Sequence, residues 1–248
     1  MREAAALMLV RDSAQELEVC MLRRVASSRF AAGAYVFPGG SVDASDAELS
    51  ADRLYLQDAS QQAHADKAYK VAAIRETFEE AGILPAVVPE DVVLNDQLRE
   101  KLHQGELGLD TLLLSSGLRI NLNGLVFYDH WITPEAAPIR FDTRFYLSTA
   151  PEGQQLVHDE KETDSSCWAK PADILDLYDK EDVKLMPVTH VQLTRLAGFA
   201  SVDELMKFAA DQGDISPTMP VIGRSDDGKG KIVKIDLREG LVEYPVFK

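Results

Sequence analysis

Three glutamates stand close together in the segment RETFEEAGI, residues 75–83. Glu76, Glu79 and Glu80 are spaced three and four apart, so a helix would place all three on one face. Like charges at this spacing destabilise a helix by about 0.2–0.5 kcal/mol per pair. Their carboxylate oxygens are hard ligands of the kind that Mg²⁺ or Mn²⁺ prefers, and a bound cation would replace repulsion by attraction. A solvated acidic surface is the alternative, because runs of charge usually face solvent.

A glycine turn upstream favours the metal interpretation. The segment YVFPGG, residues 35–40, is typical of a strand that runs into a turn at Gly39 and Gly40. Because these residues lack side chains, their peptide carbonyls can approach a cation closely. Together, the glycine turn and the pattern RExxEExG followed by Ile83 resemble the signature of the Nudix hydrolases.

The resemblance implies a role for each matching residue. Glu76, Glu79 and Glu80 would bind divalent cations, either Mg²⁺ or Mn²⁺. Gly39 would lend a backbone carbonyl to the metal, and Arg75 would orient the glutamates through a salt bridge. Nudix hydrolases cleave a nucleoside diphosphate linked to a further group, and the metal lowers the pKa of the attacking water. The implied fold is α/β, a Nudix-type α/β/α sandwich with a mixed sheet and helical insertions.

The spacing departs from the family pattern. Arg75 follows Gly40 by 75 − 40 = 35 residues, against 14 in the family, so 35 − 14 = 21 residues are inserted. The first glutamate of the family pattern would fall on Asp46, six residues after Gly40. Because the insertion makes this match unreliable, Asp43 and Asp46 are both candidates. Thr77 stands where the family usually has an aliphatic residue.

A narrower similarity points to the branch that contains the peroxisomal coenzyme A diphosphatase. Its motifs match residues 22–40, 131–134, 140–145 and 194–201. This similarity implies coenzyme A or a derivative as substrate. ADP-ribose, NADH and dinucleotides are open alternatives, because the metal site recognises the diphosphate and not the groups at its ends. A non-catalytic nucleotide-sensing module is the third alternative, although a pure binder has no need of three glutamates in this arrangement.

One further acidic residue is a candidate for the chemistry. Glu162 lies six residues before Trp168, where many Nudix chains supply an acidic ligand or a general base from a loop. Glu160 competes for this role. An ordinary charged turn over residues 159–164 is an equally good interpretation. A base at either position must come within about 2.6–3.2 Å of the nucleophilic water.

The acidic segment is expected to form a helix over residues 67–81, with Asp66 as N-cap and Gly82 as C′ residue. Its apolar residues recur at spacings of three and four and predict a buried stripe beside the glutamates. They are Val71, Ile74 and Phe78.

Strands and helices alternate along the rest of the chain. A hairpin is predicted over residues 4–10 and 18–24, and further strands over residues 34–37, 124–128, 144–148 and 166–169. Helices are predicted within residues 91–116, from Pro171 and within residues 187–212, where Ser201 and Glu204 form a capping-box pattern. From Pro220 the pattern returns to strand and turn.

No repeat is visible, and the mixture predicts one domain over residues 1–248. Residues 41–66 and 91–116 would be insertions, and residues 171–215 a helical C-terminal appendage. Residues 216–248 would close a pocket or form a contact in a homodimer, and the sequence leaves both open.

Charge and cysteine content limit the partners. With 26 basic and 41 acidic residues the net charge is −15, which argues against nucleic acid and membrane surfaces as partners. A small anionic substrate would therefore need a metal ion or local cations. Arg24 and Arg29 flank the glycine strand and are candidates to bind it, with surface solubility as the alternative for Arg24. Cys20 and Cys167 indicate free thiols in a reducing compartment, and we expect a cytoplasmic protein.

Overall fold

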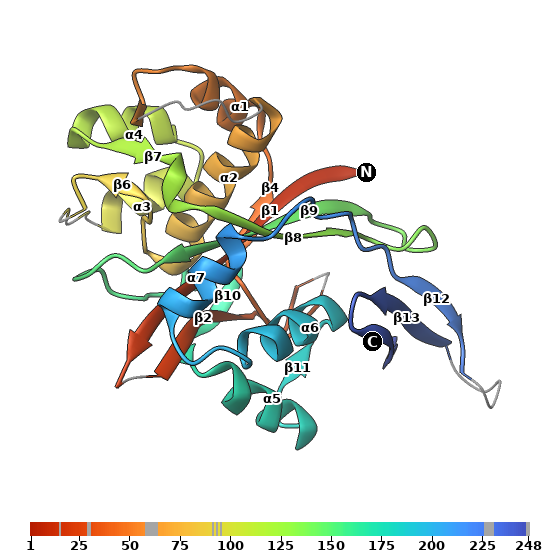
Figure 1. The fold of residues 1–248 in the computed structure, drawn as a ribbon. Helices are drawn as coiled ribbons and strands as arrows, with labels where there is room; N and C mark the ends of the chain where they lie inside the picture. The colour runs from red at the N-terminus through yellow and green to blue at the C-terminus, as the bar shows by residue number, and fades with distance from the viewer. Residues whose placement is uncertain are drawn as a thin grey trace.

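The computed structural model describes residues 1–14, 16–28, 31–57, 64–90, 92, 94, 96–225 and 231–246, with no side-chain description at residues 64 and 65. Figure 1 shows a central sheet with helices on both sides. The strand order is β11-β3-β2-β1-β9-β8, with β4 paired to β1 and β10 paired to β2. The strands are β1 (Arg2–Ser13), β2 (Glu16–Arg24), β3 (Ala34–Val36), β4 (Gly39–Ser41), β8 (Val126–Ile132), β9 (Phe141–Thr149), β10 (Thr163–Ala169) and β11 (Lys184–Leu185).

Strand β1 lies in the middle of this sheet and is buried on both faces. It pairs in parallel with β9 and antiparallel with β2 and β4, so the sheet is mixed. Successive side chains of a strand point to opposite faces. Leu7 and Leu9 accordingly pack into one apolar cluster, and Met8 and Val10 into another. The predicted α/β/α sandwich with a mixed sheet is confirmed.

The first cluster is covered by the acidic helix and the two predicted insertions. The helices on this face are α1 (Ala44–Ala51), α2 (His64–Ala81), α3 (Asp96–His103) and α4 (Leu109–Ser116). A small sheet of order β5-β7-β6 accompanies them. Its strands are β5 (Leu56–Gln57), β6 (Val87–Val88) and β7 (Arg119–Asn121). In the described part of each insertion the polar sequence is therefore partly helical.

The second cluster is covered by C-terminal elements. These are the helices α5 (Pro171–Asp179), α6 (Pro187–Leu196) and α7 (Val202–Ala210), and the antiparallel strands β12 (Val221–Arg224), β13 (Lys231–Leu237) and β14 (Gly240–Pro245). Pro171 stands in the first turn of α5, as predicted. The region of strand and turn predicted from Pro220 includes residues 226–230, which lie outside the described residues. None of the helices in the described ranges is long and apolar enough to cross a membrane.

Helix α2 extends further than its sequence predicts. It begins at His64 rather than Lys67, so the prediction of Asp66 as N-cap is wrong. The Asp66 carboxylate instead accepts a hydrogen bond of 2.6 Å from the Tyr146 hydroxyl, across to β9. The other end is as predicted, because Gly82 has a φ of +72° and its N–H donates to the Phe78 carbonyl.

One other predicted boundary is confirmed and one is corrected. The cap that the Ser201 and Glu204 pattern predicts within residues 187–212 is present, because Ser201 is the N-cap of α7 and accepts a hydrogen bond of 3.3 Å from the Glu204 N–H. The strand predicted from Gly124 begins at Val126, because residues Leu122–Gly124 form a 3₁₀ turn, η1. In both places a local hydrogen bond to a side chain sets the boundary of the element.

Candidate active site

The two glycines of strand β4 lie close to α2 at Gly40 and to β1 at Gly39. A Cβ atom built on Gly40 would lie 2.5 Å from the carboxyl carbon of Glu76. A Cβ atom on Gly39 would lie 2.4 Å from the backbone oxygen of Ala5 in β1. The N–H of Gly39 donates to Glu80 Oε2 at 3.0 Å. Gly39 and Gly40 therefore lie directly against the glutamates, in strand β4 rather than in the predicted turn. The predicted role of the Gly39 carbonyl stays a prediction.

Arg75 holds the glutamates from one side. Its Nη1 lies 2.9 Å from Glu76 Oε1 and 3.4 Å from Glu79 Oε1. Its Nη2 also donates to the Ser41 carbonyl at 3.0 Å. The salt bridge that the resemblance implied for Arg75 is present.

The inserted segment supplies the partner that fixes Arg75. Asp46 in α1 accepts two hydrogen bonds of 2.9 Å, from Nε and Nη2 of Arg75, in the bidentate arrangement that gives such pairs their geometric precision. Asp46 is 1% exposed, and the Asp43 side chain lies 3.6 Å away from the guanidinium and is 62% exposed. Of the two candidates Asp43 and Asp46, it is therefore Asp46 that forms the buried pair with Arg75. Although burial alone would lower the pKa of Arg75, its bonds to Asp46 and the nearby glutamates raise it.

Burial makes the three glutamates resist ionisation. It raises the pKa of Glu76 to about 7, against the lowering effect of Arg75. It also raises the pKa of Glu79, and that of Glu80 well above its ordinary value, with the charge of Glu76 adding to the effect on Glu80. The interpretation of this face as a solvated acidic surface is thus wrong. The cluster carries more negative charge than Arg75 compensates.

These residues fit a hard divalent cation by chemistry, but their side chains are not gathered around one point. Within the described ranges, no group of three or more His, Cys, Asp or Glu side chains is arranged to hold a metal ion. Glu76 and Glu79 are turned toward Arg75, and Glu80 toward the Gly39 N–H. All the candidate donors are oxygens, and a cation would favour the ionised carboxylates that burial disfavours.

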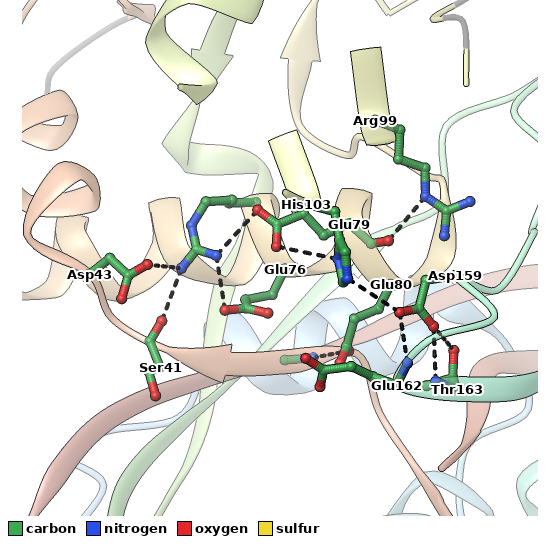
Figure 2. Close-up of polar contacts among 12 residues, drawn as sticks. Ser41, Asp43, Glu76, Glu79, Glu80, Arg99, His103, Asp159, Glu162 and Thr163 are labelled. Carbon is green, nitrogen blue, oxygen red and sulfur yellow. Dashed lines mark hydrogen bonds and ion pairs between the residues drawn. The ribbon is translucent and has the colours of Figure 1, made fainter. Parts of the chain in front are cut away.

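The loop before β10 brings Glu162 to the same place. In Figure 2 the Glu162 carboxylate lies beside that of Glu80, and the charge of Glu162 contributes to the raised pKa of Glu80. The Glu162 side chain is 55% exposed, so its carboxylate can meet water. Arg24 Nη2 lies 3.9 Å from Glu162 Oε2 and also donates to Ser28 Oγ. Arg29 lies outside the described residues, so its predicted role in binding stays a prediction.

Three residues of this neighbourhood escaped the sequence predictions. Arg99 and His103 come from α3, and Asp159 begins the turn that carries Glu162. His103 lies between Glu79 and Asp159, with nitrogen-to-oxygen distances of 3.9 and 3.6 Å. No spacing in the sequence connects these residues, since the contacts join segments that are far apart along the chain. Only the fold brings them together.

A cavity of about 630 Å³ lies on the other face of the central sheet. Its lining comes from β8, from α6 and α7, and from the segments that follow, and includes Phe199, Phe208, Met219 and Arg238. None of its lining residues belongs to the acidic site. The C-terminal elements therefore enclose a space of their own rather than closing over the glutamates.

The chain is similar to known proteins over most of its length. The sequence model of the NUDT19 Nudix domain matches residues 52–196, more than half of the chain. The acyl-coenzyme A diphosphatase NUDT19 of Xenopus laevis is 28% identical over 88% of this chain and 70% of its own length. The human protein of the same name is 25% identical over 87% of this chain and 70% of its own length.

A solved structure supports the same assignment. The structure of a NUDIX hydrolase from Alicyclobacillus acidocaldarius has a TM-score of 0.73 and 30% sequence identity, and the match covers 88% of this chain and 98% of that one. The chain thus belongs to the NUDT19 Nudix domain family, and it is a Nudix hydrolase, an enzyme that acts on diphosphate bonds.

Proposed function

We propose that the protein hydrolyses the diphosphate of coenzyme A or of an acyl derivative, with Mg²⁺ or Mn²⁺ as cofactor. The observation that carries the proposal is the buried cluster of Glu76, Glu79 and Glu80, whose pKa values are raised chiefly by burial, so that a bound cation would favour their ionised form. The substrate class follows from the relatives named acyl-coenzyme A diphosphatase. The products would be 4′-phosphopantetheine, or its acyl form, and adenosine 3′,5′-bisphosphate.

The three glutamates and Gly39 would hold the cation. A divalent ion bound there neutralises the diphosphate and lowers the pKa of the attacking water. The chain's own task is to keep the ligands in position. The pair of Arg75 and Asp46 does so by holding Glu76 and Glu79, and the Gly39 N–H does so by holding Glu80.

Glu162 is the proposed general base. Its carboxylate is exposed, lies beside Glu80 and has a partly buried guanidinium, Arg24, close by. In this position Glu162 would accept the proton of the water that attacks phosphorus. Arg24, with Arg29, would contact the anionic end of the substrate. Glu160, the competing candidate, is exposed and has a positive φ of 60°.

The wider assignments belong to the same proposal. Residues 1–248 would form one Nudix domain, with insertions at 41–66 and 91–116 and the helical appendage at 171–215. A cytoplasmic location is consistent with the free thiols of Cys20 and Cys167. The acidic net charge of −15 supports a small anionic substrate rather than nucleic acid.

A substrate panel tests the proposal. The purified protein is incubated with coenzyme A, acyl-coenzyme A, ADP-ribose, NADH and diadenosine polyphosphates, with Mg²⁺ or Mn²⁺ and with an EDTA control. We expect metal-dependent cleavage of coenzyme A or its acyl form well above the other compounds, detected as adenosine 3′,5′-bisphosphate. A stronger reaction with ADP-ribose or NADH would reject the coenzyme A assignment. A folded protein that cleaves none of them would favour the nucleotide-sensing alternative.

A further inference from the structure

Helix α3 is fixed against the end of the acidic helix by a buried arginine. The last carbonyls of an α-helix have no partner within the helix. At the end of α2, Arg99 Nε donates to the Glu79 carbonyl at 3.0 Å, and the Val157 N–H donates to the Ala81 carbonyl at 2.9 Å. Arg99 is only 9% exposed. Both α3 and the loop that leads to β10 are therefore anchored at the C-terminal end of α2.

His103, in the last turn of α3, lies between two carboxylates. Its Nδ1 is 3.9 Å from Glu79 Oε2, and its Nε2 is 3.6 Å from Asp159 Oδ2. Figure 2 shows the ring between these two side chains. Nδ1 is buried and has no hydrogen-bond partner among the described residues. The two distances exceed those of direct hydrogen bonds, as is common in sites that tighten only when their ligands bind.

Asp159 is itself fixed in place, and it fixes the turn that carries Glu162. Its carboxylate accepts hydrogen bonds from the Glu162 N–H at 2.9 Å, the Thr163 N–H at 2.8 Å and the Thr163 hydroxyl at 2.7 Å. Burial opposes ionisation of Asp159, but these bonds outweigh it and lower the pKa. Asp159 is therefore an anionic anchor that cannot turn away from His103 without breaking the turn.

We propose that His103 is a positioning residue, which holds Glu79 at a set distance from Asp159 and thereby aligns the metal-binding face of α2 with Glu162. The two ring nitrogens face the two carboxylates, Nδ1 toward Glu79 and Nε2 toward Asp159, and the rigid ring separates them. The proposal rests on the proposed function, because that function gives Glu79 and Glu162 their roles. It assigns a task to α3, part of the insertion at residues 91–116.

The variant His103→Ala tests this role with two measurements. The dissociation constant of Mn²⁺, measured without substrate from the electron paramagnetic resonance signal of free Mn²⁺, should rise about tenfold or more. At saturating Mn²⁺, kcat on the substrate found in the panel should fall about 10–100-fold, with KM changed less than threefold. We expect kcat to change more than KM because Glu79 and Glu162 lose their alignment, while the groups that bind the ends of the substrate stay in place.

Two conservative variants separate the two contacts. An asparagine at position 103 places its amide near the site of Nδ1, and a glutamine places its amide near the site of Nε2. His103→Asn, which keeps a donor toward Glu79, should bind Mn²⁺ within about threefold of the original protein, yet keep a reduced kcat. His103→Gln, which keeps a donor toward Asp159, should recover less of the Mn²⁺ affinity. Both keep a polar side chain larger than that of alanine, so they remain informative if His103→Ala does not fold.

Gln104→Ala is the matched control. Gln104 is the next residue, is exposed, and donates to Glu100 Oε1 at 2.9 Å, away from Glu79 and Asp159. It should leave Mn²⁺ affinity and kcat unchanged. Equal losses in Gln104→Ala and His103→Ala would overturn the proposal, as would unchanged Mn²⁺ affinity and kcat in a folded His103→Ala. If Glu79→Gln also leaves Mn²⁺ binding unchanged, the proposed role of Glu79 as a metal ligand is rejected. That result would reject the proposed function itself, not the role of His103 alone.

Discussion

At the scale of single residues, the Arg75 guanidinium holds two carboxylates of an acidic cluster whose full negative charge it does not balance. Arg75 contacts Glu76 and Glu79, yet burial still raises the pKa of both carboxyl groups. Glu80, the most buried of the three glutamates, accepts a hydrogen bond from the Gly39 N–H. If the proposed function holds, these buried carboxylates destabilise the metal-free protein and serve as oxygen ligands when a cation binds.

Replacing Glu79 by Gln separates the contribution to catalysis from the contribution to stability. We expect turnover to fall by about 100-fold or more, because a hard oxygen ligand and its charge are lost. The melting temperature in EDTA should stay the same or rise, because like-charge repulsion is relieved. Steady-state kinetics and thermal denaturation measure the two effects. Glu100→Gln, at an exposed position of α3, is the control and should change neither; normal turnover in Glu79→Gln would reject Glu79 as a metal ligand.

At the scale of elements, the inserted segments complete the site. Helix α1 supplies Asp46 to Arg75, and β4 supplies Gly40, whose lack of a side chain leaves room for the Glu76 carboxylate. The same carboxylate of Asp46 also accepts the Asp43 N–H at 2.8 Å and so caps its own helix. The 21 inserted residues therefore add helix α1, and Asp46 of this helix is the partner of Arg75.

Asp46→Asn and Asp43→Asn form a matched pair at the start of α1. Removing one partner of a buried ion pair costs roughly 3–5 kcal/mol, and Arg75 keeps its other contacts, so Asp46→Asn should cost about 3 kcal/mol of unfolding free energy. Asp43 is largely exposed and lies 3.6 Å from the guanidinium, so Asp43→Asn should change stability by less than about 1 kcal/mol. Urea denaturation measures both. Equal effects would show that Asp46 does not have a special role.

Gly40→Ala and Gly39→Ala should fail in different ways. At Gly40 the new methyl group meets the end of the flexible Glu76 side chain, so Glu76 should be displaced and turnover should fall with little loss of stability. At Gly39 the methyl group meets the backbone of Ala5 and Ala6 in the central strand, so the fold itself should be destabilised. Melting temperature and kcat distinguish the two outcomes. Full activity in Gly40→Ala would contradict the position assigned to Glu76.

At the scale of the whole molecule, the central sheet separates two apolar clusters, and the candidate site lies on the side of only one of them. One face carries α2 and the site, and the other carries α5, α6, α7 and the C-terminal strands over a separate apolar cluster. Figure 1 shows these groups of elements on opposite sides of the sheet. The active-site face thus derives its rigidity from β1, whose residues contribute to both clusters.

A bound cation should stabilise the entire fold. A ligand at 100 times its dissociation constant that binds only the folded state adds about 2.7 kcal/mol. For a chain of this size that corresponds to a rise in melting temperature of roughly 5–10 °C. We expect Mn²⁺ to produce such a rise over EDTA in the original protein and a much smaller one in Glu79→Gln. An equal rise in both would show that the metal binds elsewhere.

The acidic helix was predictable from the sequence because its signals are local. Apolar spacing located the buried stripe of Val71, Ile74 and Phe78, and Gly82 marked the C-terminus. The N-terminus was predicted wrongly, since Asp66 forms a tertiary hydrogen bond to Tyr146 instead of a cap. Local sequence propensity contains no information about a hydrogen-bond partner on another strand, such as Tyr146 on β9.

The sequence by itself determined the family, the mixed α/β/α architecture and the cluster of glutamates opposite the glycine pair, because these depend on residue type and short spacing. The tertiary structure alone decided that Asp46 rather than Asp43 pairs with Arg75, that the glutamates are buried rather than solvated, and that α3 brings His103 between Glu79 and Asp159. The physical reason is that a desolvated carboxylate or a buried ion pair depends on which distant segments exclude water from it.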